Sequence, residues 1–143
     1  MAEIKRVSPA EAQQLVDSGY VYVDVRSVPE FEAEHPSHAY NVPLMHMGGG
    51  GMTPNAEFVT VMKARFASDA KLVLGCKSGG RSLRAAQALA GAGFTDVIDQ
   101  RAGFDGARDP FGALTEAGWK AANLPVESGD GGERSWTKLT AKP

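Results

Sequence analysis

The stretch between residues 71 and 90 constrains the fold of this chain more than any other part of the sequence. An apolar run at 71–74 predicts a buried strand. An alanine- and leucine-rich run at 82–90 predicts a helix. Only a short turn separates them, so the strand leads directly into a helix N-terminus. This order of elements is typical of an α/β domain built on a mainly parallel sheet.

The turn contains the sole cysteine of the chain, Cys76, which is followed by two glycines and two basic residues. Gly79 and Gly80 let successive N–H groups turn toward one point, and a helix N-terminus attracts anions. Together with the charges of Lys77 and Arg81, these features favour thiolate over thiol. A lone cysteine is often a small buried hydrophobe, but that role does not need these polar neighbours. The pattern therefore predicts a nucleophile in an anion-binding cradle.

Helical and strand-like patterns alternate along the rest of the chain, as expected for an α/β fold. The segment Ser8-Pro9-Ala10-Glu11 predicts a capped helix start, with that helix ending near Gly19. Three further helices are predicted: a short one that begins near Pro29, one over 56–67 and one over 114–120. Further strands are predicted over 20–25, 40–42 and 96–98. The four glycines of Gly48–Gly51 predict a flexible loop.

Length and composition fit one ordinary globular domain, with 143 residues, 43% hydrophobic and 22% charged. We predict a domain over residues 4–125 and a polar, glycine-rich, mobile tail over 126–143. A net charge of -2 excludes general attraction to nucleic acid or to an anionic membrane surface. With one cysteine no internal disulfide forms, and the N-terminus lacks the apolar stretch of a signal peptide. The expected location is the cytoplasm, or an organelle if a transit peptide has been removed.

The segment Cys76–Ser82 resembles the active-site loop of rhodanese-type sulfurtransferases, which also place four residues between the cysteine and the arginine. Related phosphatases have a loop one residue longer, which admits a phosphate. Other matches occur in family order, at Asp24-Val25-Arg26, Glu30-Phe31, Asn41-Val42-Pro43, Gly51–Asn55 and Gly103-Phe104. Ala102 stands where the family usually has a glycine. Lys77 and Arg81 resemble the thiosulfate-using members, and the chain is most similar to the small single-domain proteins of plants and bacteria.

This resemblance implies an α/β fold with an open, mainly parallel sheet of about five strands and helices on both faces. It also implies that Cys76 attacks the outer sulfur of thiosulfate, releases sulfite and becomes a persulfide. A thiophilic acceptor, cyanide or a thiol, would then remove the sulfur. The substrate-binding loop would comprise Lys77, Ser78, Gly79, Gly80, Arg81 and Ser82. No cofactor, metal, nucleic acid or membrane is expected to take part.

Several residues near this site have structural alternatives to a chemical role. Arg81 and Lys77 are expected to bind the sulfonate end of the donor. The alternative for Arg81 is loop closure through bonds to carbonyls or a carboxylate, which is compatible with catalysis, and the alternative for Lys77 is simple solvent exposure. Asp24, Arg26 and Glu30 are supporting residues. We expect Asp24 to be a buried hydrogen-bond acceptor and Arg26 to form an ion pair with Glu30.

Two further features leave alternatives open. His35, His38 and His46 lie near three methionines, but no recognisable ligand set is complete, so loop packing is favoured over a metal site. Three functions remain: a thiosulfate sulfurtransferase, a persulfide carrier that delivers sulfur to a partner protein, and an oxyanion enzyme such as a phosphatase or arsenate reductase. The shorter loop and the lack of a second cysteine argue against the third.

Overall fold

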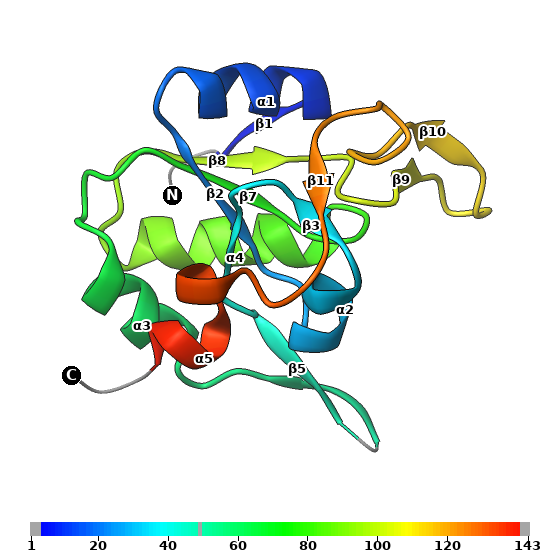
Figure 1. The fold of residues 1–143 in the computed structure, drawn as a ribbon. Coiled ribbons are helices and arrows are strands. Elements are labelled where there is room, and N and C mark those ends of the chain that lie inside the picture. Colours follow the sequence, from blue (N-terminus) through cyan, green and yellow to red (C-terminus); the bar gives the residue numbers. More distant parts are fainter. Residues whose placement is uncertain (1–3, 49, 141–143) are drawn as a thin grey trace.

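The computed structural model describes residues 4–48 and 50–140 and contains a central sheet of five parallel strands (Figure 1). The order across the sheet is β1-β8-β7-β2-β4. The strands are β1 (Lys5–Val7), β2 (Val21–Asp24), β4 (Tyr40–Asn41), β7 (Leu72–Gly75) and β8 (Val97–Gln100). The predicted α/β class with a parallel sheet of about five strands is confirmed. β1 is a strand that the sequence analysis did not predict, because Lys5-Arg6-Val7 is too short to show a strand pattern.

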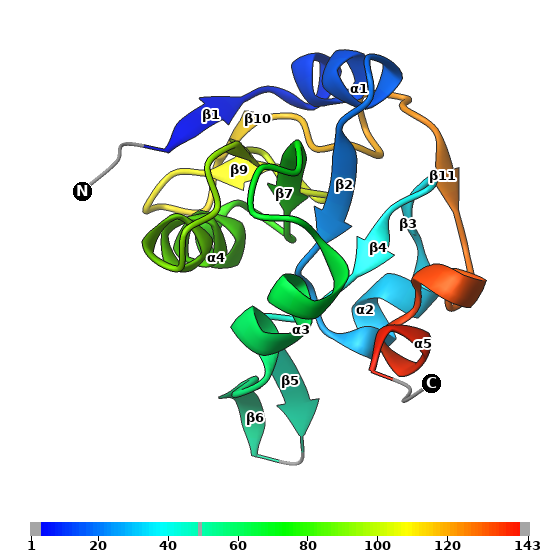
Figure 2. The same ribbon diagram turned by 90° about the vertical axis from the view of Figure 1, so that its left-hand side faces the viewer.

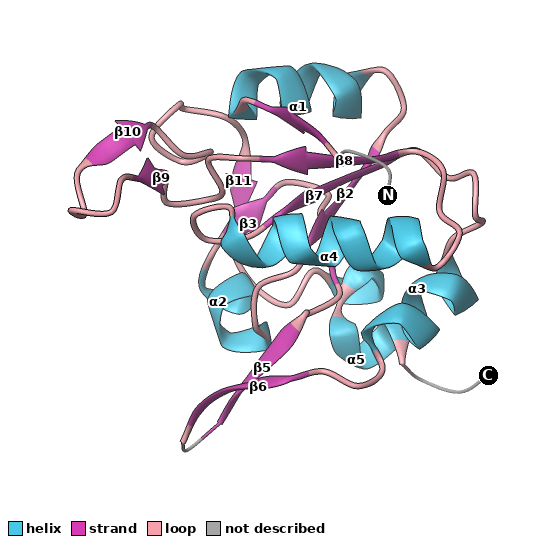
Figure 3. Cartoon of the chain, turned by 180° about the vertical axis from the view of Figure 1, so that it is seen from behind, coloured by secondary structure: helices cyan, strands magenta, loops and turns pink. Residues whose placement is uncertain are grey.

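Helices cover both faces of this sheet, as predicted. They are α1 (Pro9–Asp17), α2 (Val28–Ala33), α3 (Phe58–Arg65), α4 (Gly80–Gly91), the short 3-10 turn η1 (Gly132–Arg134) and α5 (Trp136–Leu139). Figure 1 shows α1 on one side of the sheet and α4 on the other. In Figure 3, which views the molecule from behind, α4 lies in front of the strands. α1 begins as predicted, since Ser8 and Glu11 form a capping box.

Side chains that alternate along the strands build a separate apolar core on each face. Tyr22 and Val73 point into the core that also contains Ala12 of α1. Val23 and Leu74 point into the other core, beside α3, α4 and α5. Among the described residues no helix is both long and apolar enough to cross a membrane.

Three two-stranded antiparallel ribbons are separate from the central sheet. They are β3 (His35–Pro36) with β11 (Val126–Glu127), β5 (Met45–Gly48) with β6 (Gly51–Pro54), and β9 (Ala107–Arg108) with β10 (Leu114–Glu116). The predicted helix over 114–120 is therefore wrong, because its first residues form β10. The predicted flexible loop at Gly48–Gly51 is instead the turn of the β5–β6 hairpin, which projects from the body in Figure 2. Residue 49 of that turn lies outside the described residues.

The segment after residue 125 differs from the mobile tail that the sequence predicted. Its described part, residues 126–140, returns along the domain and pairs with β3. The Glu127 carboxylate lies 2.9 Å from His35 Nε2 and accepts a 2.7 Å hydrogen bond from Arg134. Leu139 is buried in the core beside α3 and α4. Polar composition was a poor guide here, because Leu139, Trp136 and the ion-paired carboxylate of Glu127 are among the groups that hold the segment against the domain. Residues 141–143 lie outside the described part.

Candidate active site

Cys76 lies at the centre of the site, directly between the end of β7 and the start of α4. The residue is 2% exposed, and its sulfur accepts a 3.0 Å hydrogen bond from the N–H of Gly79. Gly79 adopts a left-handed conformation, with φ +101°, which turns its N–H back toward the cysteine. The strand, turn and helix predicted from the sequence are therefore present, and they bring a backbone donor onto the sulfur.

The carbonyl groups of the loop are bonded to other parts of the protein. Cys76 O accepts a 2.7 Å hydrogen bond from Phe104 N, and Lys77 O accepts one of 2.9 Å from Asp105 N. Within the described residues, the N–H groups of Lys77, Ser78 and Gly80 have no hydrogen-bond acceptor. The carbonyl groups thus fix the loop to the segment 103–105, while the three backbone N–H groups remain available to an anion.

The segment 103–105 holds the loop through close backbone contact. Gly103, at φ +68°, lies so near the loop that a Cβ on it would stand 2.4 Å from Lys77 O. Only glycine fits this approach and this backbone conformation. The sequence analysis matched Gly103 and Phe104 to a family element, but nothing in the pattern showed that they contact the cysteine loop.

Gly75, just before the cysteine, is also required by packing. A Cβ there would overlap the hydroxyl of Tyr22, which is buried and accepts a hydrogen bond from Gln100. Burial raises the pKa of Tyr22 well above its ordinary value, so this hydroxyl stays neutral beneath the loop. Gly75 is therefore required by the close packing of Tyr22 beneath the loop.

Arg81 is bound to a carboxylate rather than free for a ligand. Its guanidinium donates to both oxygens of Glu30, at 2.8 and 3.0 Å, and joins the start of α4 to α2. Burial acts to raise the pKa of Glu30, but hydrogen bonds from Arg81 and Ser27 outweigh it and lower the pKa to about 2. The structure therefore contains the loop-closing contact of Arg81 with a carboxylate. The expected Arg26–Glu30 ion pair is wrong, because each residue has another partner.

Arg26 is paired with Asp24, two residues earlier, and both side chains are buried. Asp24 accepts hydrogen bonds from the Arg26 side chain and from its backbone N–H, which confirms the expected role as a buried acceptor. The guanidinium also lies 4.4 Å from the centre of the Phe104 ring. Since Phe104 N holds the Cys76 carbonyl, this buried pair supports the loop through Phe104.

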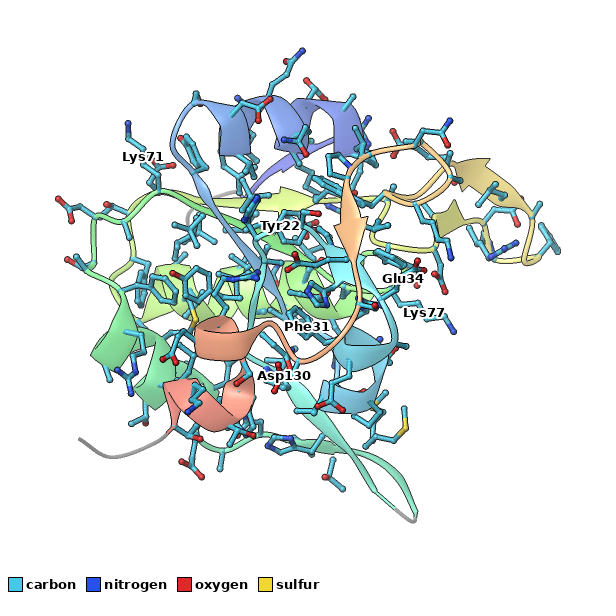
Figure 4. The ribbon with its side chains drawn as sticks, viewed as in Figure 1. Tyr22, Phe31, Glu34, Lys71, Lys77 and Asp130 are labelled. Atoms are coloured by element: carbon cyan, nitrogen blue, oxygen red, sulfur yellow. The ribbon has the colours of Figure 1, made fainter. Side chains whose placement is uncertain are left out.

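Lys77 is the cation of the loop with no acidic partner among the described residues. It lines a cavity of about 300 Å³ together with Arg26, Phe104 and Lys120. Figure 4 shows Lys77 beside Glu34, which also lines this cavity and is paired with Lys120. Because Arg81 and Arg26 are bound to carboxylates, Lys77 is the basic side chain of the loop that remains available to an anion.

The three histidines occupy separate places. His35 is buried with its ring stacked on Phe31 at 3.6 Å, and the ring of His46 lies 5.6 Å from that of Trp136. In residues 4–48 and 50–140 no group of three or more His, Cys, Asp or Glu side chains could hold a metal ion. His35 and His46 thus pack against aromatic rings, and His35 also contacts Glu127.

A family model described as "Rhodanese-like domain" matches residues 8–109, which include the cysteine loop and the segment that holds it. The chain belongs to the rhodanese-like domain family. The resemblance proposed from the loop motif is therefore confirmed over most of the domain.

Rhodanese-like relatives occur in plants and bacteria. "Thiosulfate sulfurtransferase 16, chloroplastic" of Arabidopsis thaliana is 40% identical over 108 residues, 73% of this chain and 90% of that protein. "Thiosulfate sulfurtransferase GlpE" of Ectopseudomonas mendocina is 34% identical over 118 residues, 82% of this chain and 97% of that protein. Some plant relatives are longer, and this chain spans 57% of their length.

The rhodanese-like fold is also found among solved structures. The crystal structure of Rv0390 from M. tuberculosis has a TM-score of 0.75 and 26% sequence identity, covering 90% of this chain and 100% of that one. The parallel sheet with helices on both faces is therefore also found in an experimentally solved structure.

Proposed function

We propose that this rhodanese-like protein is a thiosulfate sulfurtransferase that works through a persulfide on Cys76. The observation that carries the proposal is the contact of the Gly79 N–H with the cysteine sulfur, in a loop that has other backbone donors free. Such donors stabilise negative charge on sulfur before and during the reaction without having to reorganise. Two relatives named as thiosulfate sulfurtransferases support the choice of donor.

In the first half-reaction the Cys76 thiolate attacks the outer sulfur of thiosulfate. A bond forms between Sγ and that sulfur, the sulfur–sulfur bond within thiosulfate breaks, and sulfite leaves with the bonding electron pair. No proton is transferred, which agrees with a site built from backbone donors and Lys77 rather than from a general base. Lys77 binds the sulfonate oxygens, while Arg81 keeps the loop closed through Glu30.

In the second half-reaction a nucleophilic acceptor attacks the outer sulfur of the persulfide. With cyanide, a carbon–sulfur bond forms, the persulfide bond breaks and thiocyanate leaves, which restores the Cys76 thiolate. A thiol acceptor reacts in the same way as its thiolate and leaves as a persulfide. The loop donors serve both steps, because negative charge returns to the same sulfur atom.

Intact mass spectrometry tests this proposal directly. After incubation with thiosulfate, the protein should gain the mass of one sulfur atom, and cyanide should remove it with release of thiocyanate. The matched control is Cys76→Ser, which should show neither event. A folded protein with a titratable thiol that gains no sulfur from thiosulfate would refute thiosulfate as the donor, and mercaptopyruvate and protein persulfides would be tested next.

A second candidate function, delivery of sulfur to a partner protein, uses the same persulfide. Met47 and Met52 favour it, because they face each other across the β5–β6 hairpin and are 50% and 39% exposed. Flexible methionine side chains often form adaptable protein-binding surfaces. Under this alternative, persulfide formation would be normal, turnover with cyanide would be slow, and Met47→Gln would reduce transfer to the partner alone.

A further inference from the structure

A partly buried ion pair lies next to the cysteine loop, outside the residues assigned to sulfur transfer. Arg6 of β1 and Asp99 of β8 are partners in the parallel register of these strands. Arg6 Nε donates a 2.7 Å hydrogen bond to Asp99 Oδ2. The Asp99 side chain is fully buried, whereas that of Arg6 is 39% exposed.

This pair contacts the glycine that binds the cysteine sulfur. Arg6 Nη2 lies 3.5 Å from Gly79 O and would be 3.1 Å from a Cβ at that position. The hydroxyl of Ser82 lies 3.4 Å from the same carbonyl. A Cβ on Gly79 would also stand 2.3 Å from the carbonyl of Arg101, so the residue is enclosed on several sides. Leu83 N, in the first turn of α4, donates a 3.3 Å hydrogen bond to the same carbonyl. The Gly79 carbonyl is therefore held by Arg6 together with α4, while the N–H of the same residue is directed at the cysteine sulfur.

Stability alone does not account for Asp99. A fully buried carboxylate is costly, and its Oδ1 has no hydrogen-bond partner among the described residues. Burial raises the pKa of Asp99, and the nearby Ser82 hydroxyl and Arg6 guanidinium act against it. The Asp99 carboxylate fixes the position of the Arg6 guanidinium. Without this contact, the long and partly exposed Arg6 side chain would have more conformational freedom.

We propose that Arg6 and Asp99 are positioning residues for Cys76, which keep the Gly79 N–H directed at its sulfur. Asp99 orients the Arg6 guanidinium, Arg6 holds the Gly79 carbonyl, and Gly79 presents its N–H to the thiolate and then to the persulfide. The kinetic consequence rests on the proposed sulfur transfer, whereas the effect on the thiol itself does not. A displaced N–H would leave the thiolate less stabilised and would slow formation of the persulfide.

The test compares Arg6→Lys with Arg101→Lys. Both arginines line one cavity of about 500 Å³, their side chains are 39% and 40% exposed, and each is paired with a carboxylate. Lysine keeps the charge that pairs with Asp99 but lacks the second nitrogen that reaches Gly79. The Arg101 variant makes the same chemical change in the pair with Glu116 and removes a long 3.5 Å contact with the backbone carbonyl of Arg6. No side-chain contact of Arg101 with Gly79 or Cys76 occurs among the described residues, so this variant should leave the site unchanged.

Two readouts separate positioning from folding. The first is the pH dependence of Cys76 alkylation by iodoacetamide, whose midpoint should move upward in Arg6→Lys because one hydrogen bond to the sulfur is weakened. The second is the rate of persulfide formation from thiosulfate, which should fall about tenfold, less than the loss of a whole oxyanion donor. Thermal melting shows that each variant is folded under the assay conditions.

Asp99→Asn provides a second, independent variant that keeps the shape of the side chain. It should reproduce both effects wherever it remains folded. The proposal is overturned if folded Arg6→Lys matches Arg101→Lys in both readouts. If thiosulfate gives no persulfide in any variant, the proposed function fails, while a moved alkylation profile in Arg6→Lys alone still supports the positioning role.

Discussion

Replacing Glu30 with glutamine tests the energetic link between α2 and the start of α4. In the wild type, the Glu30 carboxylate receives two hydrogen bonds from Arg81 and two from Ser27. Glutamine keeps an oxygen that can accept from Ser27, but it removes the charge that faces Arg81. Since the Arg81 side chain is only 13% exposed, its guanidinium would then be left largely without water or a counterion.

The pKa of Glu30 gives the size of the effect. A change from 4.5 in the unfolded chain to about 2 in the folded protein corresponds to about 3 kcal/mol of stability at neutral pH. The side chain is partly solvated, which screens the interaction and reduces the expected loss for Glu30→Gln to about 2 kcal/mol.

The effect has a definite pH dependence. Because folding lowers the pKa of Glu30, its contribution is complete above pH 4.5 and disappears as the pH falls toward about 2. Urea unfolding of the two proteins should therefore differ by about 2 kcal/mol at pH 7, and the gap should close as the pH approaches 2.

Glu116→Gln is the matched control, since Glu116 forms a similar bidentate pair with Arg101 near the surface. We expect that variant to lose less than about 1 kcal/mol. A Glu30→Gln protein as stable as the wild type at pH 7, or a gap that stays constant down to pH 2, would refute the view that the charged pair holds the loop closed.

Three other substitutions test separate parts of the site and fold. Lys77→Gln should raise the KM for thiosulfate about tenfold with a smaller change in kcat, as expected for loss of one charge-assisted contact; an unchanged KM would exclude Lys77 from donor binding. Gly103→Ala should cost at least about 2 kcal/mol in urea unfolding and slow persulfide formation, because its Cβ would lie 2.4 Å from Lys77 O at φ +68°. Leu139→Ala should cost about 2–3 kcal/mol while the purified protein still forms the persulfide; full wild-type stability would mean that the C-terminal segment adds nothing to the core.

The parts of the fold that the sequence predicted are those specified by neighbouring residues. The β7 strand, the cysteine turn and α4 each have a local pattern, as does the capping box at Ser8. The three-residue β1 strand has none, because its identity comes from pairing with β8. The packed C-terminal segment was missed for a related reason, since Leu139 reveals its core position only once the chain has returned to α3 and α4.

The same distinction separates the predicted from the unpredicted features of the site. The cysteine, its glycines and the start of the following helix lie within the seven residues 76–82 and could be interpreted together. The partner of Glu30 could not be predicted from the sequence. Arg26 is near Glu30 in the sequence, whereas the observed partner, Arg81, follows 51 residues later. The contacts of Gly103 and Arg6 with the loop likewise depend on strand order, which brings β8 beside β7 and β1 beside β8.

The near-complete burial of Cys76 limits which molecules can take part in the proposed sulfur transfer. Cys76 has almost no contact with solvent, so we expect it to react with compact molecules that can enter the loop. In the proposed persulfide, a second sulfur would lie about 2 Å from Sγ. We expect this outer sulfur, which is the atom offered to an acceptor, to lie nearer the surface than Sγ. We therefore expect donors and acceptors to differ in size. The sulfur atom would come from small donors, and it could pass to acceptors that are too large to reach Sγ of the unmodified Cys76.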